Sequence, residues 1–436
     1  MATHVHYDVV VAGGGTAGCV LAGRLSEDPA RTVCLVEAGP DYGPYDEGAW
    51  PADILDGRRL ALDSHCWERS DEEDRSQLRT RILGGCSSHN ACVLLRAADA
   101  DYDAWGPGWT AKELQPYLGR AEQTFGTRVL EENELSPFMK AFVEATGGDA
   151  IVHPVNMTAA GVRWNAAFAW IDPARGRENL TILGDTLVDR VLLDGTRAIG
   201  VATFAGDVHA DTVVVASSAY GSPAILLRSG ITELPVGENL SDHVGTGMGW
   251  EPTDELRADW DRWTADNPLA SASVTIRAAD GDLFLFPAVD PGYEISAAVF
   301  AMGPLSLGRV SLTGADPRAP LAIDHGFLRD ETDVDVLTDG FEQVRELGRS
   351  EAVRRYAARE TRPGESVWAE AHVRATARGF FHPTGTCGIG RVVDERGRVY
   401  GYENLVVADA SIMPTIPRVN TNLTTAAIAE KLAETI

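Results

Sequence analysis

The sequence carries few basic residues, and this shortage excludes several classes of protein. Its 436 residues include only 38 lysines and arginines against 64 aspartates and glutamates, which leaves a formal net charge of -26. An acidic surface of this kind repels phosphate backbones and anionic lipid headgroups, so the chain is not expected to bind nucleic acid or a membrane. The excess could attract a cationic substrate, although solubility alone is the ordinary reason for such a charge.

Long apolar runs and paired cysteines are also missing. No stretch approaches the roughly 18 consecutive apolar residues of a membrane helix, and the first residues lack the pattern of a secretory signal. The six cysteines contain no CxxC pair, which favours free thiols in a reducing compartment over disulfides or a zinc site. Ligand-like spacing is also absent around four histidines outside the motifs discussed below, His65, His153, His325 and His372. We therefore expect a cytoplasmic protein without a bound metal.

The first 37 residues have the pattern of a βαβ unit. Tyr7–Ala12 and Thr32–Glu37 are short, Val-rich runs typical of buried parallel strands, and a glycine turn and a helical pattern lie between them. A right-handed crossover makes two such strands parallel. Further strands of this kind are predicted at 212–217 and 404–409, and the alternation over 181–204, around an Asp-Gly turn, predicts a hairpin.

The glycine turn matches the G-x-G-x-x-G pattern that cradles a pyrophosphate. Gly13 permits the tight turn, Gly15 lets the backbone approach the ligand, and Gly18 lets helix and strand pack closely. Thr16 and Ala17 begin the helix, whose free N–H groups and positive dipole favour an anion. The pattern alone is weak and could be a structural turn, but here it lies between a strand and a helix, as the motif requires.

Glu37 supports a dinucleotide as the ligand. It ends the second strand, 19 residues beyond Gly18, where a carboxylate can accept hydrogen bonds from a ribose diol. The same carboxylate would repel the 2′-phosphate of NADP. These residues do not by themselves distinguish FAD from NAD.

The length and the distribution of strands predict two intertwined domains. Single cores stop growing beyond roughly 250–300 residues. Buried strands of the first kind recur at the beginning, middle and end of the chain, so the nucleotide-binding domain is expected to be discontinuous, over 1–150, 180–247 and 380–436. The substrate-binding domain would be inserted as 151–179 and 248–379. The predicted fold is α/β (α+β overall), with a Rossmann-like domain and an antiparallel-sheet substrate domain.

Several further motifs occur in one order along the chain. They are VEAGP at Val36–Pro40, LGGCSSHN at Leu83–Asn90, the segments Ser218–Ile231 and Val236–His243, and a C-terminal block that opens with FHPTGTC at Phe381. Together they resemble the glucose–methanol–choline (GMC) oxidoreductase family, and LGGCSSHN is most similar to its choline oxidase-like members. The resemblance implies FAD rather than NAD as cofactor. It also implies oxidation of a small alcohol to a carbonyl by hydride transfer to flavin N5.

The resemblance also implies a set of cofactor contacts. They are Ala38, Gly84, Gly85, Asn90, Asp409, Ala410 and the backbone of Val188, which would contact the adenine. His89 matches the histidine that is bonded covalently to the flavin 8α-methyl. The alternative for His89 is a packed polar side chain beside the isoalloxazine. Asp409 could instead end a strand and cap the next turn.

Two residues of the C-terminal block match the catalytic pair of the family. A neutral imidazole at His382 can take the hydroxyl proton of an alcohol, and Asn420 can hydrogen-bond and orient the same oxygen. Asn420 could also be an N-cap, because it precedes a helix predicted over 421–435. That helix would direct its positive end at the flavin pyrimidine. His243 is expected only to order a loop.

The chain departs from choline oxidases at the substrate site. Ala91 replaces a serine, Phe380 and Phe381 are bulky and apolar, and no carboxylate can be assigned to a trimethylammonium group. These differences weaken choline as the substrate.

The electron acceptor and the oligomeric state stay open in the sequence. Oxygen is the expected acceptor, and a dehydrogenase that uses a quinone or another redox carrier is the first alternative. A non-redox flavin lyase or flavin-binding protein is an alternative of a different class, and a nicotinamide enzyme is the most distant one. A homodimer is compatible with the sequence.

Overall fold

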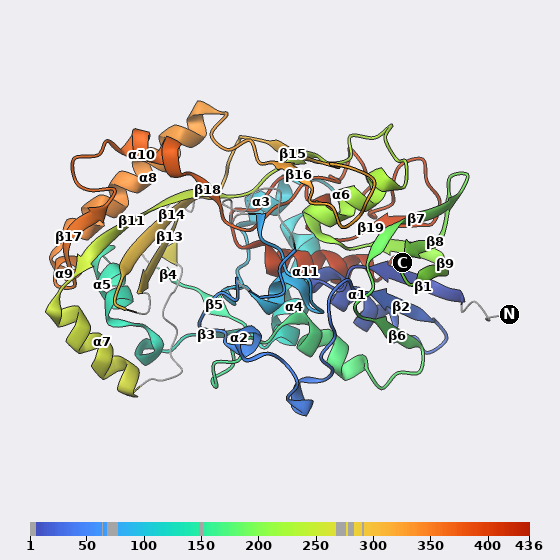
Figure 1. The fold of residues 1–436 in the computed structure, drawn as a ribbon, viewed down its shortest axis with the longest axis horizontal. Helices are drawn as coiled ribbons and strands as arrows, with labels where there is room; N and C mark the ends of the chain where they lie inside the picture. Colours follow the sequence, from blue (N-terminus) through green and yellow to red (C-terminus); the bar gives the residue numbers. More distant parts are fainter. Residues whose placement is uncertain are drawn as a thin grey trace.

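The computed structural model contains two large sheets, which lie toward opposite ends of the long axis of the molecule (Figure 1). The structure describes residues 6–62, 64–67, 77–147, 151–266, 276–277, 283–289 and 292–436. None of its helices, within these residues, is long and apolar enough to cross a bilayer.

The first sheet has the strand order β6-β2-β1-β9-β8-β7, with β19 beside β9. Its strands are β1 (His6–Ala12), β2 (Val33–Val36), β6 (Leu180–Leu183), β7 (Val188–Asp194), β8 (Arg197–Thr203), β9 (Gly206–Val215) and β19 (Leu405–Val407). β1 is parallel to β2, with Val9 opposite Val33 and Ala12 opposite Val36. Helix α1 (Thr16–Leu25) connects them, so the predicted βαβ unit is confirmed.

The predicted hairpin over 181–204 is wrong in its first part. β7 and β8 do form an antiparallel hairpin. Residues 180–183, however, form the separate strand β6, which pairs in parallel with β2 from Leu180 opposite Val33 to Leu183 opposite Val36. The alternating pattern there belongs to a half-buried strand at the edge of the parallel sheet. A hairpin strand has the same periodicity, so the pattern alone does not distinguish the two positions.

Helices bury the first sheet and bring the end of the chain back to its start. α11 (Thr421–Leu432) begins where the sequence predicts, and nearly all of its residues are buried. It packs against α1 and against α4 (Ala111–Phe125). Glu430 of α11 is fully buried and bonds to Arg24 of α1 and to the indole nitrogen of Trp170. The N-termini of α1 and α11 are joined by a hydrogen bond of 2.7 Å from Thr16 to the Asn422 side chain.

The second sheet is antiparallel and has the order β17-β11-β14-β13-β12-β4, with β18 beside β11. Its strands are β4 (Ile151–Val152), β11 (Val244–Pro252), β12 (Ile276–Arg277), β13 (Leu283–Val289), β14 (Ile295–Ala301), β17 (Ala357–Arg362) and β18 (Arg378–Gly379). One face packs under α8 (Glu331–Arg349) through residues such as Leu283 and Val299. The alternate residues, among them Phe284 and Phe300, belong to the core of the first domain. The second sheet therefore turns one face toward the nucleotide-binding sheet.

The remaining elements are short or peripheral. The helices are α2 (Ala52–Leu55), α3 (Asp99–Asp103), α5 (Pro137–Ala145), α6 (Ser218–Arg228), α7 (Asp254–Asp266), α9 (Glu351–Arg354) and α10 (Ala369–Thr376). The strands are the pair β3 (Arg128–Val129) and β5 (Pro154–Val155), and a small sheet of β10 (Glu238–Leu240), β15 (Gly308–Ser311) and β16 (Ala322–Asp324).

Candidate active site

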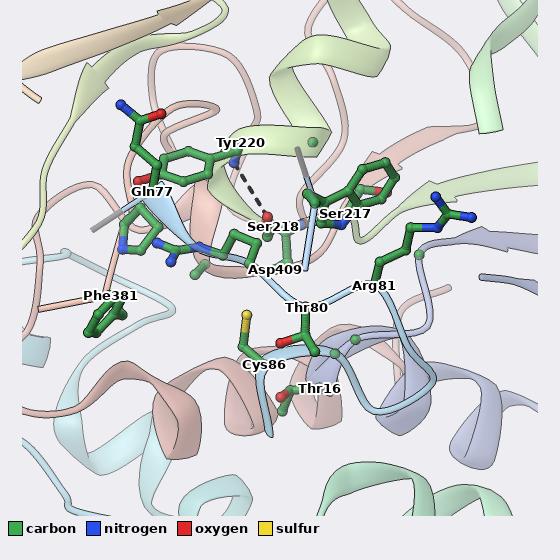
Figure 2. Close-up of a pocket in the computed structure, with 18 of the residues that line it drawn as sticks. Thr16, Gln77, Thr80, Arg81, Cys86, Ser217, Ser218, Tyr220, Phe381 and Asp409 are labelled. Carbon is green, nitrogen blue, oxygen red and sulfur yellow. Dashed lines mark hydrogen bonds between the residues drawn. The ribbon is translucent and has the colours of Figure 1, made fainter. Parts of the chain in front are cut away.

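A cavity of about 900 Å³ is lined by residues of both sheets. Most of the residues that the sequence analysis singled out line it: Gly13, Gly15, Thr16, Ala17, Glu37, Ala38, Gly85, His89, Asn90, Val188, His382, Asp409, Ala410 and Asn420. Gly18 and Gly84 do not. Figure 2 shows Arg81 and Phe381 toward opposite sides of the pocket, with Cys86 and Asp409 between them. The cavity is thus elongated, with a nucleotide end and a histidine end.

The glycine turn opens the nucleotide end to a ligand. A Cβ atom at Gly18 would lie 1.8 Å from the carbonyl oxygen of Gly13, so this glycine permits close packing of helix and turn. A Cβ atom at Gly15 would meet nothing nearer than the Cα of Gly85 at 4.0 Å, so Gly15 faces open space. No side chain caps the N-terminus of α1. Its first N–H groups are therefore free to bind the phosphates of a dinucleotide.

Glu37 lies at the same end, where β2 finishes. Its two carboxylate oxygens accept hydrogen bonds of 2.8 Å from the backbone N–H groups of Gly14 and Gly39. Burial raises the pKa of Glu37 to about 7, against the lowering effect of these two N–H donors. Each oxygen keeps a second acceptor position, which a ribose hydroxyl can use.

The LGGCSSHN segment supplies two reactive side chains at the cavity wall. His89 is 3% exposed, and its Nδ1 atom has no hydrogen-bond partner within the described part of the chain. Burial would raise the pKa of the Cys86 thiol, but the neighbouring His89 and Arg79 hold that pKa at about 6. The sequence analysis did not single out Cys86. Cys86 lies within the motif, but its contact with Arg79 becomes visible only in the fold.

The predicted catalytic pair meets at the other end of the cavity. Nε2 of His382 lies 3.3 Å from the side-chain nitrogen of Asn420, which is a long hydrogen bond. Asn420 is the residue before α11, but its side chain makes no capping bond to the helix. Asn420 thus occupies the N-cap position of α11, but its side chain does not cap the helix. Its Oδ1 atom has no partner among the described residues.

A second histidine determines the tautomer of His382. Nε2 of His243 lies 3.0 Å from the carbonyl oxygen of Pro417, and its Nδ1 lies 2.9 Å from Nδ1 of His382. Burial lowers the pKa of His243 to about 3, and burial, His243 and Arg79 lower the pKa of His382 well below its ordinary value. Both rings are therefore neutral at physiological pH.

The hydrogen-bond chain then has a single consistent direction. A carbonyl oxygen only accepts, so Nε2 of His243 carries the proton and its Nδ1 is an acceptor. Nδ1 of His382 must donate to it. Nε2 of His382 is left without a proton, beside Asn420 and at the cavity wall. The sequence predicts only loop ordering for His243, because 139 residues separate the two rings in the chain and their contact arises only in the fold.

Asp242 completes a cluster with the two histidines. These three side chains place ligand-type atoms within 4.8 Å of one another, as the one such group found among the described residues. Oδ1 of Asp242 accepts a 2.9 Å hydrogen bond from the backbone N–H of His382, and burial raises the pKa of this carboxyl to about 7. Because the ring nitrogens of His243 are both engaged, the cluster serves to hold His382. The absence of a metal stays a prediction.

Asp409 both lines the cavity and caps the following turn. Its carboxylate accepts hydrogen bonds of 2.8 Å from the backbone N–H groups of Ser218 and Ser411 and one of 2.5 Å from the Ser222 hydroxyl. Burial raises its pKa. The capping role considered from the sequence is thus present, and Asp409 lies on the cavity wall at the same time.

Aromatic side chains cover the wall around His382. Phe300 of β14 and Phe380 stack with ring centroids 3.8 Å apart and planes 9° from parallel. The Phe380 ring is 4.6 Å from that of His382. Phe381 and Ala91 also line the cavity. The part of the wall next to the His382 ring is thus apolar.

The fold and the site define a dinucleotide-dependent oxidoreductase. A parallel sheet presents a glycine turn and a buried carboxylate to one end of the cavity, and an unprotonated imidazole nitrogen lies at the other. The orphaned Nδ1 of His89 and the open N-termini of α1 and α11 fit a large polar cofactor there.

Comparisons with known proteins identify the family. The two parts of the GMC oxidoreductase family model match residues 7–245 and 304–429. The chain is 32% identical to the 5-(hydroxymethyl)furfural oxidase of a Methylovorus species, over 100% of this chain and 99% of that protein. It is also 32% identical to the oxygen-dependent choline dehydrogenase of Burkholderia multivorans, over 99% and 93% of the two chains. The chain belongs to the GMC oxidoreductase family and is an FAD-dependent enzyme that acts on CH–OH donors.

A solved structure agrees with this assignment. Pyridoxine 4-oxidase from Mesorbium loti superimposes with a TM-score of 0.85 at 26% identity, over 98% of this chain and 99% of that one. The alignment with the furfural oxidase runs over 531 positions, more than the 436 residues of the chain, so that relative carries segments which this chain lacks.

Proposed function

We propose that the protein oxidises an alcohol to a carbonyl compound, with His382 as the base and Asn420 orienting the hydroxyl group. The observation that carries the proposal is the position of the His382 Nε2 atom at the cavity wall, 3.3 Å from the side-chain nitrogen of Asn420. The hydrogen bonds through His243 assign this nitrogen as unprotonated. The relatives named for choline and for 5-(hydroxymethyl)furfural support an alcohol as substrate.

Two side chains would handle the substrate hydroxyl. The long contact between His382 and Asn420 leaves room for the hydroxyl oxygen to accept from the Asn420 amide while its proton points at Nε2 of His382. His382 then accepts that proton, and its Nδ1–H bond to His243 steadies the ring during the transfer. Bound FAD supplies the acceptor of the substrate's hydride, at its N5 atom. The Phe300–Phe380 stack keeps water from this end of the cavity.

The experiment that tests the function is anaerobic reduction of the purified flavoprotein by a panel of alcohols. Bleaching of the flavin by at least one alcohol, with formation of the aldehyde or ketone, is the expected result. A flavin that no alcohol bleaches would favour a lyase or flavin-binding protein. Oxygen is the proposed acceptor, and release of peroxide on aerobic turnover separates it from a quinone or another redox carrier.

We expect FAD to be bonded covalently to His89. The buried Nδ1 atom of His89 lacks a partner within the described chain, and Cys86 beside it, with its pKa lowered to about 6, is a thiolate that can accept a proton. Acid precipitation of the protein should leave the yellow colour in the pellet. His89→Ala should release it into the supernatant, and Asn90→Ala, a neighbouring substitution at the cavity wall, should not. Colour wholly in the supernatant of the unaltered protein would contradict the link.

His243 is expected to be a positioning residue. His243→Ala removes the acceptor for Nδ1–H of His382, so the imidazole can turn and adopt the other tautomer. Flavin reduction should slow by about 10- to 100-fold with little change in FAD content. His243→Asn offers an amide oxygen to the same donor and should recover part of the rate. Equal rates in both variants would show that His243 acts only through packing.

The pH profile of flavin reduction follows from the depressed pKa of His382. Because this pKa lies well below the ordinary 6.5, the neutral, proton-accepting form persists as the pH falls through that value. The rate in Asp242→Asn, which lacks the Asp242 carboxyl with its pKa of about 7, should therefore stay flat from pH 8 to about pH 6. Asp242→Asn is the control, since the Asp242 pKa of about 7 could add its own limb. An acidic limb near pH 6.5 that survives in Asp242→Asn would contradict the tautomer argument.

A further inference from the structure

The charged side chains on the cavity wall are mostly cationic. Among the described residues, the lining contains Arg79, Arg81, Arg228, Arg318 and Arg378 against the carboxylates of Glu37 and Asp409. Both carboxylates already accept backbone N–H groups. Glu37 lies at the nucleotide end, where it is assigned to a ribose, and Asp409 holds the Ser218, Ser222 and Ser411 donors, so neither carboxylate is assigned to a cationic substrate.

Most of these arginines have a partner or belong to the nucleotide end. Arg228 bonds to Asp189, and Arg318 pairs with Asp316. Arg81 donates to the carbonyl oxygen of Ala38 and lies on the side of the pocket away from Phe381 (Figure 2). Arg79 lies with its guanidinium 4.5 Å over the Tyr220 ring and donates to the Leu78 carbonyl.

Arg378 is different. Within the described part of the chain it has no hydrogen bond or ion pair, and its charged neighbour is a second cation, Arg362. Burial and Arg362 lower its pKa, yet the side chain keeps accessible surface and lies on the cavity wall. Arg378 is an exposed residue, and part of its surface belongs to the cavity wall. An unneutralised guanidinium in such a place is a binding site for a carboxylate.

The position of Arg378 relative to the base defines the shape of a ligand. Residues 378–383 all line the cavity, and Arg378 precedes His382 by four residues. β18 ends at Gly379 and the chain turns at Phe381, where φ is 66°, so both side chains belong to one short stretch of the wall. Between the two lies the Phe380 ring, stacked on Phe300. Along this stretch of the chain, the wall thus presents a cation at Arg378, a flat apolar ring at Phe380 and a base at His382.

We propose that the substrate is an aromatic alcohol that carries a carboxylate at its far end, and that Arg378 binds this carboxylate. The proposal rests on the function proposed above. The pyrophosphate of FAD would lie at the N-terminus of α1 on the other sheet, so it does not neutralise Arg378 on β18. The net charge of -26 opposes the approach of an anion, and 0.15 M salt, where the Debye length is about 8 Å, screens that long-range repulsion but not the contact.

The test compares three para-substituted benzyl alcohols whose far groups are anionic, neutral and cationic, with the carboxylate and the amide matched in shape. They are 4-(hydroxymethyl)benzoate, the neutral 4-(hydroxymethyl)benzamide and the cationic 4-(hydroxymethyl)-N,N,N-trimethylanilinium. In anaerobic flavin reduction by the holoenzyme, the benzoate should have the highest kcat/KM, by on the order of 10- to 100-fold over the amide. Arg378→Gln should remove this advantage and leave the amide nearly unchanged. Arg318→Gln, at the same wall but with its partner Asp316, should keep it.

The outcomes separate the substrate from the function. If the amide reduces the flavin as well as the benzoate does, or if Arg378→Gln keeps the preference, the assignment of Arg378 is overturned while the alcohol oxidation stands. If no alcohol reduces the flavin, binding decides: plain benzoate should perturb the flavin absorbance at lower concentration than benzamide, and Arg378→Gln should abolish the difference. Equal binding would overturn the proposal. Arg378→Met also removes the charge at a similar side-chain length, and it replaces the glutamine variant if that one fails to fold.

Discussion

Replacement of His382 by alanine is expected to slow reduction of the flavin by alcohol about 10²- to 10⁴-fold, the usual contribution of a positioned general base. The loss should appear in the first-order rate of flavin reduction rather than in FAD content. His382 reaches the cavity through an imidazole whose Nδ1 is held by His243, 2.9 Å away. Alanine leaves no group in reach of the substrate proton, while the glycine turn and Glu37 lie at the other end of the cavity.

Two companion variants separate catalysis from packing at His382. Asn420→Ala removes the side chain that would orient the hydroxyl, and its helix loses no capping bond because Asn420 makes none. We therefore expect a smaller loss, about 10-fold, at unchanged thermal stability. Thr425→Ala also changes a cavity-lining residue of α11, but its hydroxyl bonds the carbonyl of Thr421, and reduction should stay close to normal. Fast reduction in His382→Ala, measured by anaerobic stopped flow, would remove the base from the proposal.

The local features of the fold could be predicted from the sequence, and the distant contacts could not. The βαβ unit was predictable because Val9–Ala12 and Val33–Val36 are continuous buried runs on either side of a glycine turn. Strand β6 was not, because its place beside β2 depends on a pairing that skips the residues between them. The hydrophobic pattern of a strand indicates which of its faces are buried, but it does not indicate which other strand pairs with it.

The same difference divides the site. His382 and Asn420 lie within one C-terminal block and carry the family motif, so their meeting could be expected. The bond from His382 to His243 joins residues 139 apart, and no spacing in the sequence indicates it. Arg378 carries no motif at all. Arg378 is singled out because no carboxylate pairs with it within the described chain. The lack of an ion-pair partner can be recognised only in the folded structure.

A second large effect is expected from alanine at Gly18, and it should differ in kind from that of alanine at Gly15. Alanine is the better helix former by about 1 kcal/mol, but its Cβ at position 18 would lie 1.8 Å from the carbonyl oxygen of Gly13. Backbone must move to relieve this contact, at a cost of about 1–3 kcal/mol or more. Gly18→Ala should therefore lower the melting temperature of the apoprotein, and it should also distort the turn that receives the pyrophosphate.

Gly15→Ala isolates the ligand contact from the packing. The backbone at Gly15 has φ -73° and ψ -165°, which alanine adopts without strain, and the new methyl group would meet no protein atom nearer than 4.0 Å. The apoprotein should melt as the unaltered protein does, whereas FAD should bind at least about 10-fold more weakly, because the methyl group occupies the place where backbone and phosphate approach. Thermal melts of apoprotein and FAD titrations measure both effects. If Gly15→Ala binds FAD normally, the phosphates do not lie against this turn, and the nucleotide end of the cavity must be assigned elsewhere.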